Sequence, residues 1–347
     1  MTSPKPVRIG YIGAGNFSQR RLLPQLKKVT GVELVAIANR TPESSQKVAD
    51  AFGFRRVAKD WREVVDAKDV DVIVVGTRTD MHPEMCVPVL EAGKHLLSMN
   101  AIAGNLEGAQ AMLKAAQARP NLVALVYPGQ FYLREEAMMQ RLLREGYVGK
   151  VLQVFSYWYS PFFGLASQFE IANRWFGAHT RVLSYRKGFD IPSRGQDDRG
   201  RAGRPESNIV LAELAGGAPI TYVHSTVAGD SALWRFEVYG DQGSVYCYPS
   251  GQAAGFAGQV KTGFFGAKVS DKEIQPVPVP AEMRSAAGEL LSVPVEAEFI
   301  AAVRGEKQPS VAVPRFLDGV RMMEFAEAWR KSAASGAWVS LPQEVAV

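Results

Sequence analysis

The feature that most constrains the fold is a glycine-rich turn directly after the first apolar run of the chain. The apolar run covers residues 7–12, the turn contains Gly13 and Gly15, and a helix-like stretch follows over residues 19–28. Ser18 stands where the motif G-x-G-x-x-G has its third glycine, and a small residue there still permits close packing of helix on strand. A strand, a glycine turn and a helix in this order are typical of the start of a dinucleotide-binding fold.

The two glycines have different expected roles. Gly13 allows the tight turn, and Gly15 lets the backbone approach a pyrophosphate. The free N–H groups at the start of the following helix would then bind the anion. The motif alone is a weak signal, because 32 of the 347 residues are glycine, and an ordinary turn between a strand and a helix would look the same. The interpretation therefore depends on the context that follows.

That context is a regular alternation of strands and helices through residue 127. Residues 32–38 and 70–76 are continuous apolar runs, which is typical of buried parallel strands. Thr41 is the expected N-cap of a helix that has Pro42 at its first position. Further strands are expected at 7–12, 95–98 and 122–127, and further helices at 19–28, 61–65, 82–92 and 106–118. The alternation predicts a doubly wound parallel sheet, a Rossmann domain, over residues 1–127.

The sequence pattern changes after residue 127. Strands follow one another with short glycine-containing turns, such as the turn at residues 240–243, which predicts a mainly antiparallel sheet. The strands are expected at 151–159, 209–214, 220–228, 234–239 and 244–248, and helices at 133–145, 295–304 and 315–332. Residues 128–347 are therefore expected to form a second, α+β domain. Residues 187–206 and 250–266 are expected to be irregular, either as loops over a substrate site or as surface loops without a function.

Composition limits the class of protein. A chain of 347 residues favours two domains, and 47% hydrophobic with 22% charged residues is a globular composition. No apolar run approaches the roughly 20 residues of a membrane span, and no signal-peptide pattern precedes the first strand. Cys86 and Cys247 are the only cysteines, which favours a reduced, cytoplasmic protein. The net charge of +5 is dispersed, so no nucleic-acid-binding stripe is expected, and no residues show metal-ligand spacing.

The residues after the second strand bear on the cofactor. An NAD site usually has an acidic residue there, which binds the ribose hydroxyls. This chain has Asn39, Arg40 and Thr41. No carboxylate would repel a phosphate, and Arg40 could pair with one, so the sequence favours NADP, with NAD as the alternative. Arg40 could also be a surface charge beside the start of a helix.

At several places the chain resembles the Gfo/Idh/MocA oxidoreductases, the group of glucose-fructose oxidoreductase and inositol dehydrogenase. The resemblance is carried in order by residues 9–16, 38–43, 75–82, 90–95, 237–244 and 338–342. It implies a Rossmann domain followed by a domain with an open, largely antiparallel sheet, a nicotinamide cofactor and a small-molecule substrate. It also implies a homodimer or homotetramer that forms through the C-terminal sheet.

The glycine motif and the resemblance together give a set of expected cofactor-binding residues. They are Gly13, Gly15, Asn16, Phe17, Asn39, Arg40, Thr41, Thr77, Arg78, His82, Ser98, Asn100 and Gln130.

Three positions depart from the family pattern. Met99 stands where the family has the lysine of Glu-Lys-Pro, which lies beside the nicotinamide and the substrate. Phe163 and Ser167 stand where the family has an aspartate and a histidine that face the substrate. A thioether transfers no proton, which excludes lysine-assisted chemistry. These three residues are expected at the substrate, in an atypical active site.

The four histidines are the remaining candidates for acid–base chemistry. His82 is expected to support the cofactor site rather than to react. His95 is expected to be structural, and His179 to lie on the surface. His224 is expected inside a strand, where it either acts as an acid in the cleft or is a hydrogen-bonded residue of the sheet.

Tyr159 is a second candidate proton donor, at the end of an expected strand. Strand alternation places it on the same face as Tyr157. Packing in a subunit interface is the alternative role.

The sequence thus predicts a cytoplasmic NADP-dependent reductase of an activated C=C, C=N or C=O bond. Such a group needs mainly a well-placed hydride donor. Two alternatives stay open. One is a redox-neutral lyase, hydrolase or isomerase with a tightly bound nicotinamide, and the other is a non-catalytic NADP-binding sensor or scaffold.

Overall fold

The computed structural model describes residues 6–128, 134–159, 165–192, 205–227, 233–248, 263–310 and 312–342. The chain divides into two compact units. The first comprises residues 1–130 and 294–323, and the second comprises residues 131–293 and 324–347. Within the described residues no helix is long and apolar enough to cross a membrane.

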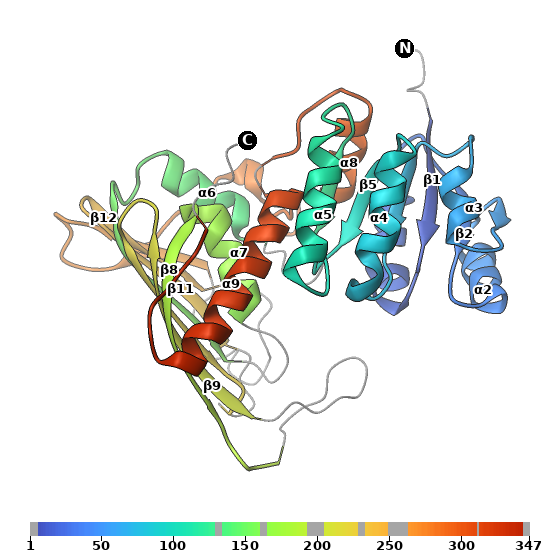
Figure 1. Cartoon of the computed structure of the whole chain (residues 1–347). Helices are drawn as coiled ribbons and strands as arrows, with labels where there is room; N and C mark the ends of the chain where they lie inside the picture. Colours follow the sequence, from blue (N-terminus) through green and yellow to red (C-terminus); the bar gives the residue numbers. More distant parts are fainter. Residues whose placement is uncertain are drawn as a thin grey trace. The chain divides into compact units, whose positions relative to one another are not determined.

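The first unit is built on a parallel sheet of six strands in the order β3-β2-β1-β4-β5-β6 (Figure 1). The strands are β1 (Val7–Ile12), β2 (Val32–Ala38), β3 (Arg56–Val57), β4 (Val72–Val75), β5 (His95–Met99) and β6 (Ala124–Tyr127). All four side chains of β4 are completely buried, as its continuous apolar sequence predicts. This strand order reverses between β1 and β4, which is the arrangement of a dinucleotide-binding sheet. The predicted Rossmann fold is confirmed.

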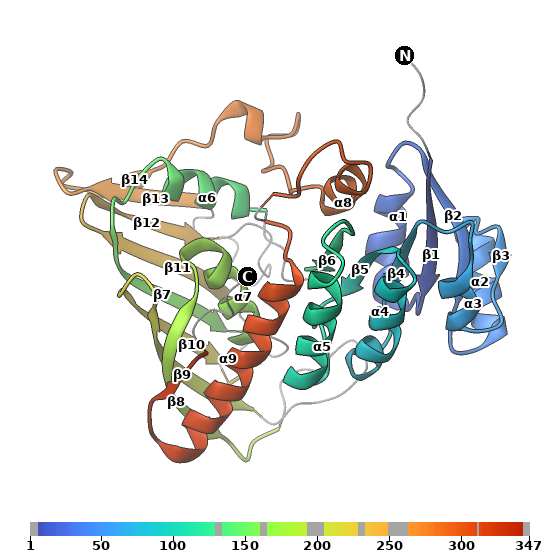
Figure 2. The same ribbon diagram turned by 45° about the horizontal axis from the view of Figure 1, so that its top comes forward.

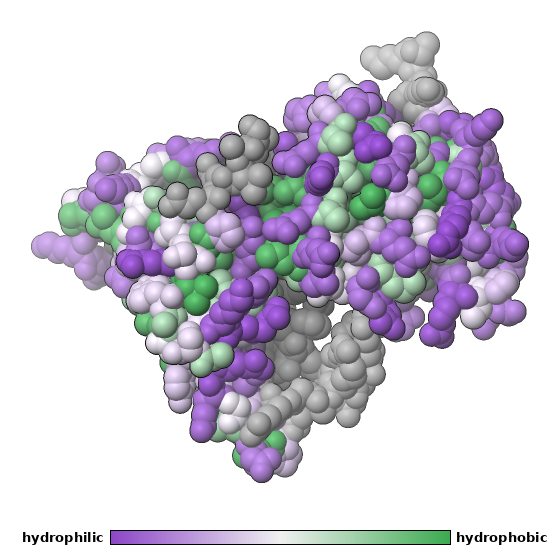
Figure 3. Space-filling model, in the orientation of Figure 1, coloured by the Kyte–Doolittle hydropathy of each residue, from purple (hydrophilic) through white to green (hydrophobic). Residues whose placement is uncertain are grey.

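Helices cover the two faces of this sheet (Figures 1 and 2). They are η1 (Ser18–Leu22), α1 (Leu23–Leu26), α2 (Pro42–Phe52), α3 (Trp61–Asp66), η2 (Thr79–Met81), α4 (His82–Glu91), α5 (Leu106–Gln117) and α8 (Val295–Val303). Thr41, Asp60 and Asn105 cap α2, α3 and α5 by accepting backbone N–H groups with their side chains. The face of this unit seen in Figure 3 is mainly hydrophilic, which fits a core that lies between sheet and helices.

The first helix differs from its predicted range of residues 19–28. Helical structure begins at Asn16, directly after the glycine turn, and ends at Leu26. The N–H of Gln19 already donates to the carbonyl of Gly15 at 3.0 Å. The start was misplaced because Asn16 and Phe17 are not strong helix formers, and the turn before them decides where the helix begins.

The predicted domain boundary also needs correction, because residues 294–323 return to the first unit. The Tyr127 hydroxyl donates to the Glu296 carboxylate at 2.9 Å. The N–H of Val126 donates to the carbonyl of Pro314 at 2.8 Å, and Arg304 donates to the carbonyl of Thr30 at 2.7 Å. These contacts join segments far apart in sequence, so a division into 1–127 and 128–347 does not describe the two compact units.

The second unit contains a mixed, mainly antiparallel sheet of nine strands in the order β14-β13-β12-β11-β7-β10-β9-β8-β15 (Figure 2). The strands are β7 (Val151–Tyr159), β8 (His179–Gly188), β9 (Glu206–Leu214), β10 (Pro219–Ser225), β11 (Leu233–Gly240), β12 (Gly243–Tyr248), β13 (Gly263–Lys268), β14 (Gln275–Pro276) and β15 (Val339–Ser340). Among the strand pairs described, β7 and β10 are the parallel pair. The predicted fold class of this part is confirmed.

One face of this sheet is covered by helices α6 (Glu136–Arg144), α7 (Leu165–Phe176) and α9 (Phe316–Ser335), and a short η4 (Ala281–Met283) lies in the connection before α8. Gln168 of α7 donates to the hydroxyl of Ser156 on β7 at 2.9 Å. The Phe325 ring of α9 lies 5.8 Å from the Tyr222 ring of β10. Opposite these contacts the side chains of Tyr185 and Ile209 are 62% and 47% exposed. The sheet therefore has a helix-covered face and an open face.

The prediction that His179 lies on the surface was wrong. His179 begins β8 and is 5% exposed. Its Nε2 lies 2.6 Å from the Tyr222 hydroxyl, and its ring packs against Phe169 and Phe325. Burial lowers the pKa of His179 to about 3. A neighbouring glycine and a polar sequence suggested a loop, but the aromatic partners come from three other elements.

Strands β8, β9 and β13 extend into the two segments that were predicted to be irregular. Lys187 and Gly188 belong to β8 and Glu206 to β9. Residues 263–266 belong to β13. Residues 193–204 and 250–262 lie outside the described residues.

A buried ion-pair network between α6 and α7 gives a test of stability. Arg174 donates to both carboxylate oxygens of Glu136, at 2.6 and 2.9 Å, and to Glu170 at 2.8 Å. The three side chains are at most 4% exposed. We expect Arg174→Ala to lower the free energy of unfolding by about 3–5 kcal/mol, because it leaves buried carboxylates without their cation. Urea denaturation measures this value.

The matched control is Lys331→Ala, which removes the exposed ion pair with Glu327 on α9. We expect it to leave the unfolding midpoint nearly unchanged, because exposed pairs contribute little. Equal midpoints for the two variants would contradict a stabilising role of the buried network.

Candidate functional site

The glycine turn after β1 lies against the loop after β4. Gly13 has a φ of +81°, and a Cβ built on it would lie 2.4 Å from Thr77 Cγ2 and 2.8 Å from Thr77 N. Side chains rarely adopt this backbone conformation, and no space is left for one. The adjacency of β1 and β4 in the sheet creates this contact. Glycine at position 13 is therefore required by the fold itself.

The packing of the turn does not require a glycine at position 15. It is exposed, and a Cβ built on it would meet nothing within 4 Å. Asn16 beside it is also exposed. Helical structure begins at Asn16, and no side chain caps the segment Ser18–Leu22 that continues it. This end of the helix is therefore accessible, and its N–H groups and dipole favour an anion.

The ends of β1, β4 and β5 converge at this turn. A Cβ on Gly76 would lie 2.9 Å from the Gly13 carbonyl oxygen, 3.0 Å from Ser18 Oγ and 3.4 Å from Met99 Cγ. Met99 ends β5 and is 9% exposed. Its partner in the sheet register is Tyr127 at the end of β6, and the Tyr127 ring lies 6.2 Å from the ring of Phe17. The predicted residues Gly13, Phe17, Thr77 and Met99 are thus brought together in one unit.

His82 joins the loops that follow β4 and β5. Its Nε2 lies 3.1 Å from the Thr77 carbonyl oxygen. Its Nδ1 lies 3.0 Å from the Ile102 carbonyl oxygen and 3.3 Å from Ser98 Oγ. The side chain is completely buried, and burial lowers its pKa. These contacts fit the predicted supporting role. Ser98 is completely buried beside His82, so its side chain is not exposed at the predicted cofactor site.

The end of β2 is organised by Asn39. Its Oδ1 accepts the N–H of Ala14 at 2.7 Å, and its Nδ2 donates to the Ser44 carbonyl at 3.2 Å. Thr41 accepts the N–H of Ser44 at 3.2 Å. The side chains of Asn39 and Thr41 thus hold the glycine turn and the start of α2. Arg40 is exposed and forms no ion pair with the residues that the structure describes.

The other predicted cofactor residues have mixed placements. Arg78 is exposed and forms a two-contact ion pair with Asp80, at 3.0 and 2.5 Å. Asn100 follows β5, and its N–H donates to the Tyr127 carbonyl at 3.2 Å. Gln130 and the predicted substrate residue Phe163 lie outside the described residues.

The remaining predicted residues lie in the second unit. Ser167 is on α7 and 1% exposed, and its hydroxyl has no hydrogen-bond partner among the described residues. His224 is on the helix-covered face of β10, with Nδ1 3.3 Å from Asn208 Nδ2. Tyr159 ends β7, and alternation puts it with Phe155 and Tyr157 on the open face. His224 and Tyr159 therefore lie on opposite faces of the sheet.

Comparison with known proteins adds to this geometry. Residues 7–127 match the GFO_IDH_MocA family model, described as an oxidoreductase family with an NAD-binding Rossmann fold. The match ends where β6 ends. The nucleotide-binding domain belongs to the Gfo/Idh/MocA oxidoreductase family.

Two curated proteins each match less than half of this chain. The chain is 34% identical over 120 residues to 4-carboxy-2-hydroxymuconate-6-semialdehyde dehydrogenase of Sphingobium sp., covering 35% of this chain and 38% of that protein. It is 29% identical over 147 residues to dTDP-3,4-didehydro-2,6-dideoxy-alpha-D-glucose 3-reductase of Saccharopolyspora spinosa, covering 42% of this chain and 44% of that protein. The chain thus spans less than half the length of these curated relatives.

The structural similarity covers nearly the whole chain, unlike the sequence similarity. A levoglucosan dehydrogenase in complex with NADH and levoglucosan superposes with a TM-score of 0.77 at 20% identity, covering 98% of this chain and all of that one. Both units therefore have the fold of that dehydrogenase.

Sequence reasoning missed the pair of Tyr127 and Glu296. Burial and the Glu296 carboxylate raise the pKa of Tyr127, and burial raises the pKa of Glu296. The two residues are 169 positions apart. No pattern near either residue could have indicated the contact, because α8 is added to the Gfo/Idh/MocA domain from the far end of the chain.

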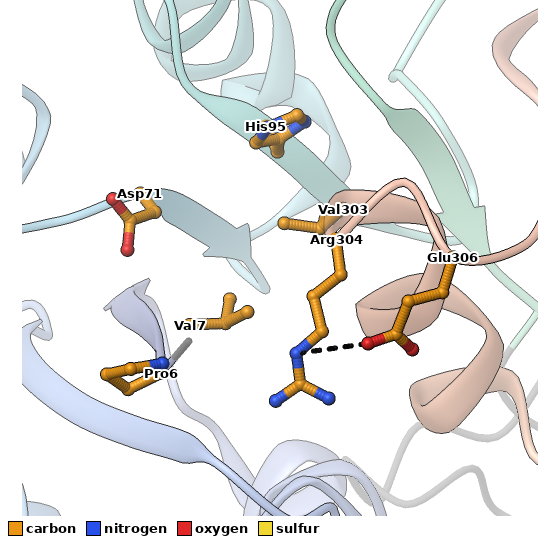
Figure 4. A pocket seen from close by; sticks show the side chains of 7 residues that line it. All are labelled: Pro6, Val7, Asp71, His95, Val303, Arg304 and Glu306. Atoms are coloured by element: carbon orange, nitrogen blue, oxygen red, sulfur yellow. Dashed lines mark ion pairs between the residues drawn. The ribbon is translucent and has the colours of Figure 1, made fainter. Parts of the chain in front are cut away.

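The first unit also has a pocket of about 420 Å³, which lies at the amino-terminal ends of β1 and β5 (Figure 4). It is lined by Pro6, Val7, Asp71, His95, Val303, Arg304 and Glu306. Val7 and His95 begin their strands, whereas dinucleotides bind at the carboxyl ends of parallel strands. This pocket is therefore not a candidate for the cofactor site.

The two glycines of the turn should respond differently to alanine. We expect Gly13→Ala to destabilise the protein by at least about 1–2 kcal/mol, because its φ is positive and Thr77 fills the space of a Cβ. We expect Gly15→Ala to leave stability unchanged but to weaken NADPH binding about tenfold or more, since the methyl group would obstruct a pyrophosphate. Thermal unfolding and NADPH fluorescence titration measure the two effects. A Gly15→Ala protein with unchanged affinity would exclude this turn as the pyrophosphate site.

Proposed function

We propose that this protein is an NADP-dependent reductase of an activated C=C, C=N or C=O bond in a small molecule. The observation that carries the proposal is the open glycine turn beside an exposed Arg40, at a strand end without a carboxylate. The family of the first unit supports a nicotinamide cofactor. The similar structure that contains NADH supports it as well.

The residues of the first unit fit such a cofactor. The accessible helix start at Gly15 and Asn16 would bind the pyrophosphate. Arg40, free of ion pairs with the described residues, would bind the 2′-phosphate of NADP, with Thr41 beside it. The strand ends at Thr77, Met99 and Asn100 would lie along the nicotinamide. When bound, the cofactor supplies a hydride.

The proposal of a reductase rests on Met99. A buried thioether replaces the lysine expected from the family pattern, so the chain has no ammonium group at this position to transfer a proton. Reduction of an already polarised bond depends mainly on placing the hydride donor. The proton would come from His224, Tyr159, the substrate or water. The relatives include proteins named as a dehydrogenase and as a reductase, so substrate and direction are parts of the proposal.

Arg40→Ala tests the choice of cofactor. We expect the Kd for NADPH to rise about 10- to 100-fold, because a charged contact to the 2′-phosphate is lost, and the Kd for NADH to stay the same. The exposed Lys59 of the same unit gives the control Lys59→Ala, for which neither Kd should change. An equal loss of NADPH and NADH affinity would contradict a 2′-phosphate contact. A nicotinamide that co-purifies and is never consumed would favour the redox-neutral alternative.

We also propose that the open face of the second unit's sheet joins copies of this chain. Tyr185 and Ile209 are 62% and 47% exposed. Phe155 stacks beside Tyr157 at 6.3 Å, and Arg235 lies 4.2 Å from the Tyr157 ring centroid. An apolar and aromatic face of this kind is typical of a subunit interface.

Ile209→Glu tests this assembly. A carboxylate on the apolar face would be desolvated in an interface, so we expect a homodimer or homotetramer to dissociate to monomers in sedimentation velocity. The control is Ile274→Glu, an exposed residue between β13 and β14. A wild-type protein that sediments as a monomer would refute the assembly.

A further inference from the structure

The pocket at the amino-terminal ends of β1 and β5 has no part in the proposed function. Its volume of about 420 Å³ is within the range of about 300–1,000 Å³ that is common for ligand pockets. All of its lining residues belong to the first unit. Val7 lines it at the start of β1, at the opposite end of that strand from the glycine turn. A ligand in this pocket would therefore not overlap the proposed pyrophosphate site.

His95 lines the pocket and provides an N–H donor. The N–H of Val123 donates to His95 Nδ1 at 2.9 Å. Because a backbone N–H can only donate, Nδ1 carries no proton, and the proton of the neutral ring is on Nε2. Burial lowers the pKa of His95, which favours this neutral form. Its Nε2 has no hydrogen-bond partner among the residues that the structure describes.

Arg304, directly after α8, brings a positive charge to the pocket. Its Nη2 donates to the carbonyls of Thr30 and Gly31, at 2.7 and 3.2 Å, which holds the guanidinium near the start of β1. Its Nε is buried and has no hydrogen-bond partner among the described residues. The nearest oxygen of Glu306 lies 4.0 Å from this Nε, which is too far for a hydrogen bond. Buried donors without partners are rare and favour an ordered water or a polar ligand.

The other lining residues limit the charge and polarity of a ligand. Figure 4 shows the side chains of Asp71 and Glu306 on opposite sides of Arg304. Arg8 donates to both oxygens of Asp71, at 2.9 and 2.6 Å, so the charge of Asp71 is compensated. A single negative charge on a ligand can therefore bind Arg304, whereas a second one would be repelled by Glu306. The apolar lining residues are Pro6, Val7 and Val303.

We propose that this pocket binds a small organic monocarboxylate. Its carboxylate accepts hydrogen bonds from Arg304, and an uncharged carbonyl or hydroxyl oxygen of the same molecule accepts the Nε2–H of His95. The apolar part of the molecule lies against Val7 and Val303. The site is independent of the proposed reductase function, because none of its residues is assigned to the cofactor.

Isothermal titration of the full-length protein tests the class of ligand. The probes are levulinate and para-acetylbenzoate, with para-acetylbenzamide as an uncharged analogue and terephthalate as an analogue with a second charge. We expect a monocarboxylate to bind with a Kd of about 1 mM or lower. Both analogues should bind about tenfold more weakly, since one loses a charged hydrogen bond and the other is repelled by Glu306. Saturating NADPH should leave the Kd unchanged. Absence of binding by both monocarboxylates, equal binding of the amide, or competition by NADPH would overturn the proposal.

Glu306→Gln tests the charge of the site without removing a proposed contact. We expect it to lower the Kd for terephthalate about threefold, because the repulsion from an exposed carboxylate is removed. Damage to the fold would weaken binding, so a gain in affinity has the opposite sign. The control Glu107→Gln changes an exposed carboxylate of α5 and should leave the Kd as in wild type. Terephthalate binding that is unchanged or weaker in Glu306→Gln would overturn the proposal.

Two further measurements locate the ligand in the pocket. Val303→Phe fills part of the pocket, so we expect it to abolish monocarboxylate binding while the unfolding midpoint stays close to that of wild type, since Val303 is only partly buried. In histidine nitrogen NMR, a saturating monocarboxylate should shift the signals of His95 and leave those of the buried His82 and His179 unchanged. The variant His95→Gln assigns the His95 signals among the four histidines. Wild-type affinity in Val303→Phe, or His95 signals that do not respond, would overturn the proposal.

Discussion

The contact between Gly13 and Thr77 is the constraint on which the first unit depends. The turn after β1 can lie directly on the loop after β4 only because position 13 has no side chain. This contact fixes where the first helix begins and leaves Gly15 and the helix start accessible. Asn39 holds the same turn from β2, and His82 holds the opposing loop against the segment after β5. The proposed cofactor site is thus formed by hydrogen bonds within the protein before any cofactor binds.

The two faces of the second unit's sheet have different kinds of side chain. The open face has exposed apolar and aromatic side chains, which suit a subunit interface. The helix-covered face has the aromatic cluster around His179 and the hydrogen-bonded side chains of Arg186, Glu206, Asn208 and His224. Because side chains alternate along a strand, Tyr159 and His224 have different environments although β7 and β10 are neighbours. This alternation separates two candidates that the sequence left equivalent.

The chain has Met99 at the position where the resemblance to the family predicts a lysine. Met99 is packed at the converging ends of β4 and β5, where a thioether is tolerated and an ammonium would need a partner. Acid–base chemistry would then have to come from another element.

The sequence by itself determined the features that depend on neighbouring residues. The glycine turn, the apolar parallel strands and the cap at Thr41 were predicted because each is a local pattern. Only the tertiary structure decided the burial of His179, the return of residues 294–323 to the first unit and the bond between Tyr127 and Glu296, which are 169 positions apart. It also showed that Asn39 holds the turn. Such contacts join segments that the chain brings together only when the sheets form, so no local pattern encodes them.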